Sequence, residues 1–253
     1  MKLRVVELLV ITTVPALVLA QKGMPSLSVT AASLIGGTLA AGSANAFNMV
    51  IESDTDKLMA RTAKRPVASG VISEIAATIF ATAIGLISLL IFWIFTTPLA
   101  TVLTLIAIVY YVVIYTIALK PNTSQNIVWG GAAGCMPVLI GWAAVTNSLT
   151  LVPVLFFLVI FFWTPPHFWA LAIKYKDDYS AAGIPMLPSV AARSKVIAQM
   201  WFHTIAMVIC SAALIQLADL PVWSLLITVG LGAVFTFQLF SLKENSDNYN
   251  KVA

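Results

Sequence analysis

Long runs of apolar residues, separated by short polar connections, dominate the pattern along this chain. A helix needs about 20 mostly apolar residues to cross the hydrocarbon core of a membrane. Eight segments approach or exceed that length, at 4–21, 27–50, 71–95, 98–119, 125–147, 149–173, 196–218 and 220–242. The pattern therefore predicts an all-α fold, a polytopic bundle of about eight transmembrane helices that forms a single integral-membrane domain over residues 1–253.

The connections between these segments alternate in length and charge. Very short connections fall near 22–26, 96–97, 148 and 219, whereas nearly all the charge lies at 51–70, 120–124 and 174–195 and after Lys243. On this arrangement 13 of the 14 lysines and arginines share one side of the membrane, and only Lys22 lies on the other. Positive residues are retained in the cytoplasm. We therefore expect both termini and the charged loops on the cytoplasmic side of a plasma or inner membrane.

Composition agrees with a protein surrounded by membrane lipid. Hydrophobic residues make up 60% of the chain, charged residues 9%, and the mean hydropathy is +0.97. Soluble domains carry about 25% charged residues, so a water-facing globular protein is excluded. Cys135 and Cys210 lie far apart in apolar stretches and predict neither a metal knuckle nor a disulfide framework. We expect membrane lipid and no nucleic acid among the partners.

Acidic and amide side chains follow the second predicted helix at helical spacing. Asn48, Glu52 and Asp56 recur at i, i+4 and i+8. If the helix continues, these side chains stack on one face, about 6 Å apart. Oxygen ligands of this kind suit Mg²⁺, which binds a few carboxylates and leaves positions for substrate phosphate. The spacing therefore predicts a metal site at the end of this helix.

Basic residues come within one or two turns of the acidic stripe, at Arg61, Lys64 and Arg65. Charge-assisted hydrogen bonds from such residues can hold a polyanion. Acids for a metal beside bases for phosphates predict a diphosphate site. The alternative is a solvated loop whose charges only fix topology, and it stays open for Asp54, Lys57 and Lys64.

A second polar cluster follows the sixth predicted helix. Pro165 and Pro166 are expected to distort this helix just before His167, and Asp177 and Asp178 follow ten and eleven residues after that histidine. Four crossings separate the two acidic clusters, so both should lie on the same face of the membrane. Two carboxylate patches that meet there could share one or two Mg²⁺ ions. Two interpretations of His167 stay open: it is either a histidine packed in the helix bundle or a residue of the functional site.

These motifs resemble those of the UbiA-type prenyltransferases. The stretch 48–66 resembles the first aspartate-rich motif of that family. Within 59–66, at 164–172 (TPPHFWALA), at 183–188 (GIPMLP) and at 125–131 (QNIVWGG), the chain is similar to the branch that farnesylates protoheme IX. Glu52 stands where many relatives have Asp, and Met49 stands where many enzymes with aromatic acceptors have Asp, which favours the heme branch.

The resemblance implies a helical bundle of the UbiA prenyltransferase type with a lipid-facing entrance. It implies Mg²⁺ as cofactor, farnesyl diphosphate as donor, heme B as acceptor and heme O as product, in a pathway that supplies terminal oxidases. Heme A synthase and oxidase assembly proteins are expected protein partners. The family usually has nine helices, so we expect this chain to be shortened at its C-terminus and near its start.

The resemblance also assigns roles to individual residues. The expected metal-binding and catalytic residues are Asn48, Glu52, Asp56 and Asp178. The expected diphosphate-binding residues are Arg61, Arg65 and Lys120. His167 is the candidate contact for heme, because it follows the two prolines in the sixth predicted helix.

Two other functions compete with this interpretation. The first is prenyl transfer to an aromatic ring, as in quinone synthesis. The second is transport, with the acidic residues as ion ligands. Transporters place such groups near the middle of the bilayer, whereas the acids of this chain cluster at one interface, which disfavours transport.

Overall fold

The computed structural model describes residues 3–60 and 62–240, and this part of the chain consists of helices and loops. Each of the eight predicted segments is helical where it is described. The long helices are α1 (Leu3–Gln21), α2 (Leu27–Ile51), α4 (Glu74–Phe95), α5 (Pro98–Val109) continued by the π-helix η1 (Tyr110–Leu119), α6 (Asn126–Thr146), α7 (Leu151–Lys174), α10 (Arg193–Leu217) and α11 (Val222–Phe240). Three short helices lie in the long connections: α3 (Ser53–Lys57), α8 (Lys176–Ala181) and α9 (Leu187–Val190).

Six of the described helices are long and apolar enough to cross a membrane, counting α5 and η1 as one. Two shorter apolar stretches, Ile11–Gln21 and Val222–Phe237, belong to α1 and α11. Large apolar side chains point outward along the bundle, for example Ile79, Trp93 and Leu226, which are 65%, 62% and 71% exposed. Lipid is the solvent that accommodates such a surface, so the prediction of a multi-pass membrane protein is confirmed.

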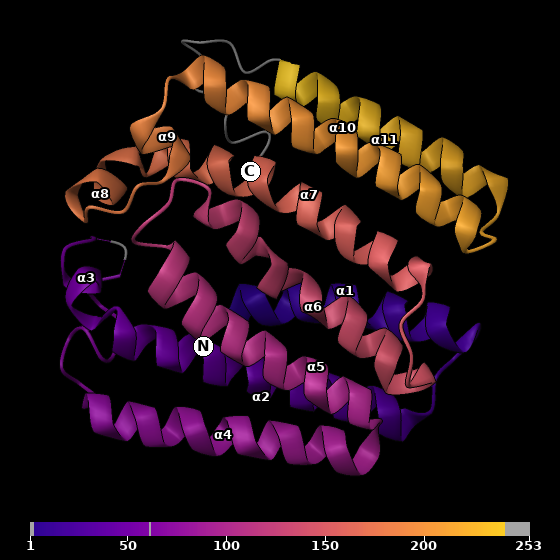
Figure 1. Ribbon diagram of the computed structural model, residues 1–253, viewed down its shortest axis with the longest axis horizontal. Coiled ribbons are helices and arrows are strands. Elements are labelled where there is room, and N and C mark those ends of the chain that lie inside the picture. The colour runs from indigo at the N-terminus through magenta and orange to yellow at the C-terminus, as the bar shows by residue number, and fades with distance from the viewer. Residues whose placement is uncertain (1–2, 61, 241–253) are drawn as a thin grey trace.

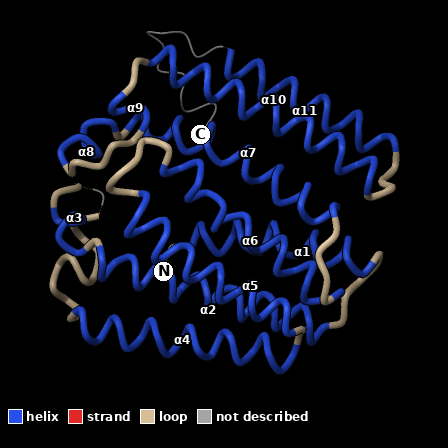
Figure 2. Tube along the Cα trace, viewed as in Figure 1, coloured by secondary structure: helices blue, strands red, loops and turns tan. Residues whose placement is uncertain are grey.

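The long helices lie roughly parallel in one bundle (Figure 1). Helix α2 packs against α4, α1 packs against α6, and α7 lies between α6 and α10, with α11 on α10. The loops that contain α3, α8 and α9 lie at one end of the bundle, and the very short connections lie at the other (Figure 2). The prediction that the charged loops share one face is therefore confirmed.

Small residues and hydroxyl groups hold α2 against α4. Ser43 donates to the carbonyl of Ala81 at 2.8 Å, and Ser88 donates to the carbonyl of Gly36 at 2.7 Å. A Cβ on Gly36 would lie 2.8 Å from Cε2 of Phe92, so the ring rests directly on the α2 backbone. Close packing and hydrogen bonds between helices replace the hydrophobic driving force inside a membrane.

The expected break at Pro165 and Pro166 is absent. Helix α7 continues through both prolines from Leu151 to Lys174. The two rings are buried, and the adjacent Thr164 hydroxyl donates to the carbonyl of Ile160 at 2.8 Å. Membrane helices tolerate proline where neighbouring helices and Ser or Thr hydroxyls compensate for lost backbone hydrogen bonds.

Candidate functional site

The three residues of the acidic stripe remain on one face although α2 ends at Ile51. Glu52 forms the joint between α2 and α3, and its amide donates to the carbonyl of Asn48 at 2.9 Å. The amide of Asp56 donates to the carbonyl of Glu52 at 2.8 Å, so the i to i+4 pattern continues across the joint. All three side chains are buried, at 3%, 7% and 2% exposure for Asn48, Glu52 and Asp56.

Two basic residues neutralise the buried carboxylates. The Arg65 guanidinium lies 2.6 Å from Oδ2 of Asp56 and 3.8 Å from Oε2 of Glu52. The Lys120 ammonium donates to Oε1 of Glu52. Buried charges are costly unless they are paired, and here two anions and two cations form one compact group. We call Glu52, Asp56, Arg65 and Lys120 the charged cluster.

Further polar contacts support the charged cluster from η1 and from the loop after α3. Asn48 Nδ2 donates to Thr116 Oγ1 at 3.2 Å, and Thr116 Oγ1 donates to the carbonyl of Tyr111 at 2.9 Å. The Thr62 hydroxyl donates to the carbonyl of Asp56 at 3.1 Å. Thr116, Tyr111 and Thr62 were not among the sequence candidates. The available signal was polar side chains inside the apolar segment 98–119, since such groups are costly in a membrane.

The wide turns of η1 carry Lys120 to Glu52. The Lys120 amide donates to the carbonyl of Tyr115 at 2.9 Å, five residues back rather than four. Such π-helical turns are rare and occur often at functional sites. Asn126, fully buried at the start of α6, donates to the carbonyl of Lys120 at 3.4 Å and secures the end of this turn.

The remaining sequence candidates are less closely placed. Arg61 lies outside the described residues. Asp178 lies on α8, half-buried, at the same end of the bundle as α3 (Figure 1). Across the described residues, His, Cys, Asp and Glu form no group of three placed to hold a metal ion. Asp178 therefore does not join Glu52 and Asp56 in one ligand group within this part of the chain.

His167 is half-buried on α7. Its ring stacks on Trp163 with 4.5 Å between centroids, and the Phe168 ring meets it edge-on at 5.4 Å. The open choice between a packed histidine and a site residue is not decided by this geometry, since an aromatic stack suits both.

Asp54 and Lys57 pair on the surface, away from the charged cluster. Their side chains are 92% and 54% exposed, 2.7 Å apart. The hydrogen bond with Lys57, and then its charge, lowers the pKa of Asp54, and the same contact raises the pKa of Lys57. Lys64 is exposed as well. For these three residues the interpretation as solvated loop charges agrees with the structure.

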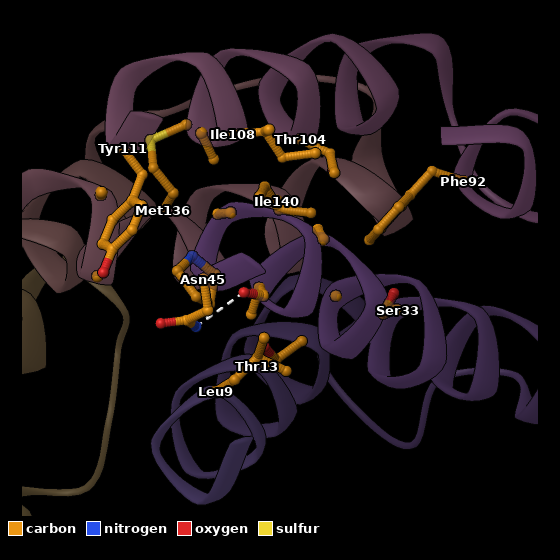
Figure 3. A pocket seen from close by; sticks show the side chains of 18 residues that line it. Leu9, Thr13, Ser33, Asn45, Phe92, Thr104, Ile108, Tyr111, Met136 and Ile140 are labelled. Carbon is orange, nitrogen blue, oxygen red and sulfur yellow. Dashed lines mark hydrogen bonds between the residues drawn. The ribbon is translucent and has the colours of Figure 1, made fainter. Parts of the chain in front are cut away.

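An interior cavity adjoins the charged cluster. Its walls come from α1, α2, α4, α5, η1 and α6 (Figure 3). The lining residues are Leu9, Thr13, Ser33, Gly37, Ala40, Ala41, Ala44, Asn45, Phe92, Thr104, Ala107, Ile108, Tyr111, Ala133, Gly134, Met136, Pro137 and Ile140. Asn45 lies one turn before Asn48. The carbonyl of Tyr111 accepts a hydrogen bond from Thr116, which itself accepts one from Asn48. The cavity is therefore a mostly apolar chamber whose polar end faces the charged cluster.

The donor set of the charged cluster fits a hard divalent cation together with a phosphate group. Two carboxylates and the amide oxygen of Asn48 are oxygen ligands of the kind that Mg²⁺ binds. Arg65 and Lys120 are the cations best suited to phosphate oxygens. An apolar chamber next to such a group can receive a hydrocarbon chain that carries a diphosphate.

Comparison with known proteins supports this chemistry. The model of the UbiA prenyltransferase family matches residues 9–252. A protoheme IX farnesyltransferase of Leifsonia xyli subsp. xyli is 49% identical over 237 residues, covering 94% of this chain and 77% of that protein. One of Renibacterium salmoninarum is 50% identical over 216 residues, covering 85% of this chain and 68% of that protein.

Solved structures share the fold at low sequence identity. A UbiA homolog from Aeropyrum pernix K1 superposes with a TM-score of 0.78 at 17% identity, covering 99% of this chain and 93% of that one. A UbiA homolog from Archaeoglobus fulgidus, bound to DMAPP and Mg²⁺, gives a TM-score of 0.77 at 16% identity, covering 99% of this chain and 93% of that one. The predicted bundle is therefore confirmed as an arrangement already seen in solved structures.

Proposed function

Because this chain belongs to the UbiA prenyltransferase family, we propose that it transfers the farnesyl group of farnesyl diphosphate to the vinyl group of heme B, giving heme O and diphosphate. The observation that supports this most directly is the charged cluster at the polar end of the interior cavity. The relatives at about 50% identity carry the name protoheme IX farnesyltransferase, which supplies the donor and acceptor of the proposal.

Mg²⁺ is the proposed cofactor. Glu52, Asp56 and Asn48 would hold it, because they present buried oxygen ligands on one helical face. When bound, the cation supplies positive charge that stabilises the diphosphate as it leaves. Asp178 remains a predicted further ligand from α8.

Different residues of this chain serve different steps of the proposed reaction. Arg65 and Lys120 bind the phosphate oxygens and stabilise the negative charge that grows there as the C–O bond breaks. The interior cavity surrounds the hydrocarbon chain with apolar walls and keeps water from the allylic cation. The electron-rich vinyl carbon of the acceptor then attacks that cation and leaves a new carbocation on the acceptor. Water adds to this carbocation and a proton is lost, which gives the hydroxyl group of the product. The protein therefore needs to position the two substrates rather than supply a nucleophile.

The acceptor is proposed to contact α7 near the charged loops. A porphyrin is a wide apolar plate with two propionates. His167, on its stack with Trp163, offers an edge or axial contact, and the exposed Lys174 and Lys176 follow at the loop end of α7. Heme A synthase and oxidase assembly proteins remain predicted partners.

We place the charged loops in the cytoplasm of the cell membrane, from the 13-to-1 distribution of lysine and arginine. Single cysteines introduced at Asp54 and Ser180, in a background without Cys135 and Cys210, should react with an impermeant maleimide only after the cells are opened. A cysteine at Ser148, in a very short connection, is the matched control and should react in intact cells. The reverse labelling pattern would overturn the orientation.

Heme analysis of whole cells tests the function. A host that lacks heme O is expected to convert heme B to heme O when it expresses this protein, as measured by chromatography and mass of extracted hemes. The variant His167→Ala should raise the KM for heme more than the KM for farnesyl diphosphate. The proposal would be contradicted if the membrane-inserted protein prenylated a quinone precursor and left heme B unchanged.

A further inference from the structure

The interior cavity has two different ends. Figure 3 shows Asn45 and Tyr111 at one end and Phe92 and Ser33 at the other. The first end adjoins the charged cluster, where a diphosphate would bind. A chain attached to that diphosphate can therefore run along the cavity from Tyr111 towards Phe92.

Small residues form the α2 wall of the cavity between its two ends. Gly37, Ala40, Ala41 and Ala44 line the α2 side, and Ala107 lines the α5 side. Side chains this short leave a smooth channel that a methyl-branched chain can occupy. Among the described residues, Phe92 is the one side chain of α4 that lines the cavity.

Phe92 is held rigidly at the far end. Its side chain is fully buried, and it packs with Leu17, Leu103 and Ile140. The ring also rests on Gly36, where even a Cβ would lie 2.8 Å from it. The ring therefore cannot turn towards Gly36 or towards Leu17 and Leu103, because packed protein interiors are as dense as crystals, and its remaining side faces the cavity.

The distance from the polar end of the cavity to the Phe92 ring can be measured along α2. Gly36, which touches Phe92, precedes Asn45 by nine residues, or about 14 Å of helix at a rise of roughly 1.5 Å per residue. Three extended isoprene units, with four backbone bonds each, span about 15 Å, which is comparable with that distance. A fourth unit would meet the Phe92 ring.

We infer that Phe92 is a specificity-determining residue that limits the donor to about three isoprene units. This inference rests on the proposed function, since it takes the interior cavity as the place of the isoprenoid chain. A smaller side chain at position 92 opens the far end to a longer chain, and a larger one closes part of the length that farnesyl occupies. The two substitutions should therefore change donor preference in opposite directions.

The test is a competition among geranyl, farnesyl and geranylgeranyl diphosphates for the purified full-length protein with Mg²⁺. Displacement of labelled farnesyl diphosphate is measured without acceptor, and the mass of prenylated heme is measured with heme B present. Phe92→Ala should shift the ratio of geranylgeranyl to farnesyl use upward by at least about tenfold, the scale on which misfitting apolar groups are discriminated. Phe92→Trp should shift the ratio of geranyl to farnesyl use upward.

Two controls separate a length limit from a general defect. Phe95→Ala removes a ring one turn away on α4 that is 53% exposed to lipid, and it should leave the preference unchanged. Phe92→Leu, a milder change, should shift preference in the same direction as Phe92→Ala and keeps the inference testable if the alanine variant does not fold. Unchanged donor ratios in both Phe92→Leu and Phe92→Trp would overturn the inference while leaving the function intact. Failure of the unaltered protein to bind any of the three donors would instead overturn the proposed function.

Discussion

Replacing Glu52 with Gln, or Asp56 with Asn, is expected to lower turnover by at least about a hundredfold, because each change removes an anionic ligand from the proposed metal site. Both residues are buried beside Arg65, and each amide keeps nearly the size and shape of the acid. The bundle should therefore still fold and insert in the membrane. Steady-state kinetics with farnesyl diphosphate and heme B measures the effect, and membrane yield reports folding.

Asp54→Asn is the matched control, since Asp54 lies on the same short helix α3 as Asp56 but is 92% exposed and pairs with Lys57 at the surface. Its turnover should stay within a few-fold of the unaltered protein. If Glu52→Gln or Asp56→Asn retained turnover within that same range, with Mg²⁺ still required, the residue would have no place in the metal site.

The second large effect is expected on stability, from Arg65→Met. The change leaves Asp56 and Glu52 buried, with Lys120 as the remaining cation of the charged cluster. Removing one partner of a buried ion pair costs on the order of 3 kcal/mol, because the other charge stays desolvated. Thermal unfolding of the detergent-solubilised protein with chelator present should show a clear loss. The KM for farnesyl diphosphate should rise as well.

The cause of that loss can be isolated. In the double variant Arg65→Met with Asp56→Asn the unpaired charge is gone, so stability should recover in part while activity does not. Added Mg²⁺ should also stabilise Arg65→Met more than it stabilises the unaltered protein, because the cation takes the place of the guanidinium. Lys57→Met, which breaks the exposed pair, should change stability little. Equal destabilisation of Arg65→Met and Lys57→Met would contradict the account.

Much of the fold follows from short-range pattern. Length and apolarity locate the long helices to within about three residues of their described bounds, because a membrane leaves few alternatives to a continuous helix. The i, i+4, i+8 spacing places Asn48, Glu52 and Asp56 on one face, and the structure keeps that face across the joint at Glu52. Such features depend on neighbours within one or two turns.

The parts that could not be predicted depend on distant contacts. Lys120 meets Glu52 across 68 residues of sequence, and only the widened turns of η1 bring it there. The two prolines of α7 predict a distortion of this helix. Packing and the Thr164 hydroxyl nevertheless allow the helix to continue through them. The interior cavity is likewise formed by six elements together, so no single segment reveals where Phe92 lies.

The charged cluster also determines how its two ligands depend on each other. Glu52 and Asp56 contribute two negative charges, and Arg65 and Lys120 contribute two positive ones, so the formal charge of the group is zero. A lone cation meets carboxylates already occupied by bases, and a lone diphosphate meets bases already occupied by carboxylates. Each ligand releases the partners that the other needs, which makes their binding free energies cooperative.

That cooperativity is reciprocal: whatever factor Mg²⁺ adds to the affinity for diphosphate, diphosphate adds to the affinity for Mg²⁺. Calorimetric titration with inorganic pyrophosphate, with and without Mg²⁺, measures the factor, and a value of one would contradict it. Without ligands, the carboxylates and the bases of the site neutralise one another. The site therefore binds the magnesium salt of its substrate more tightly than it binds magnesium or phosphate alone.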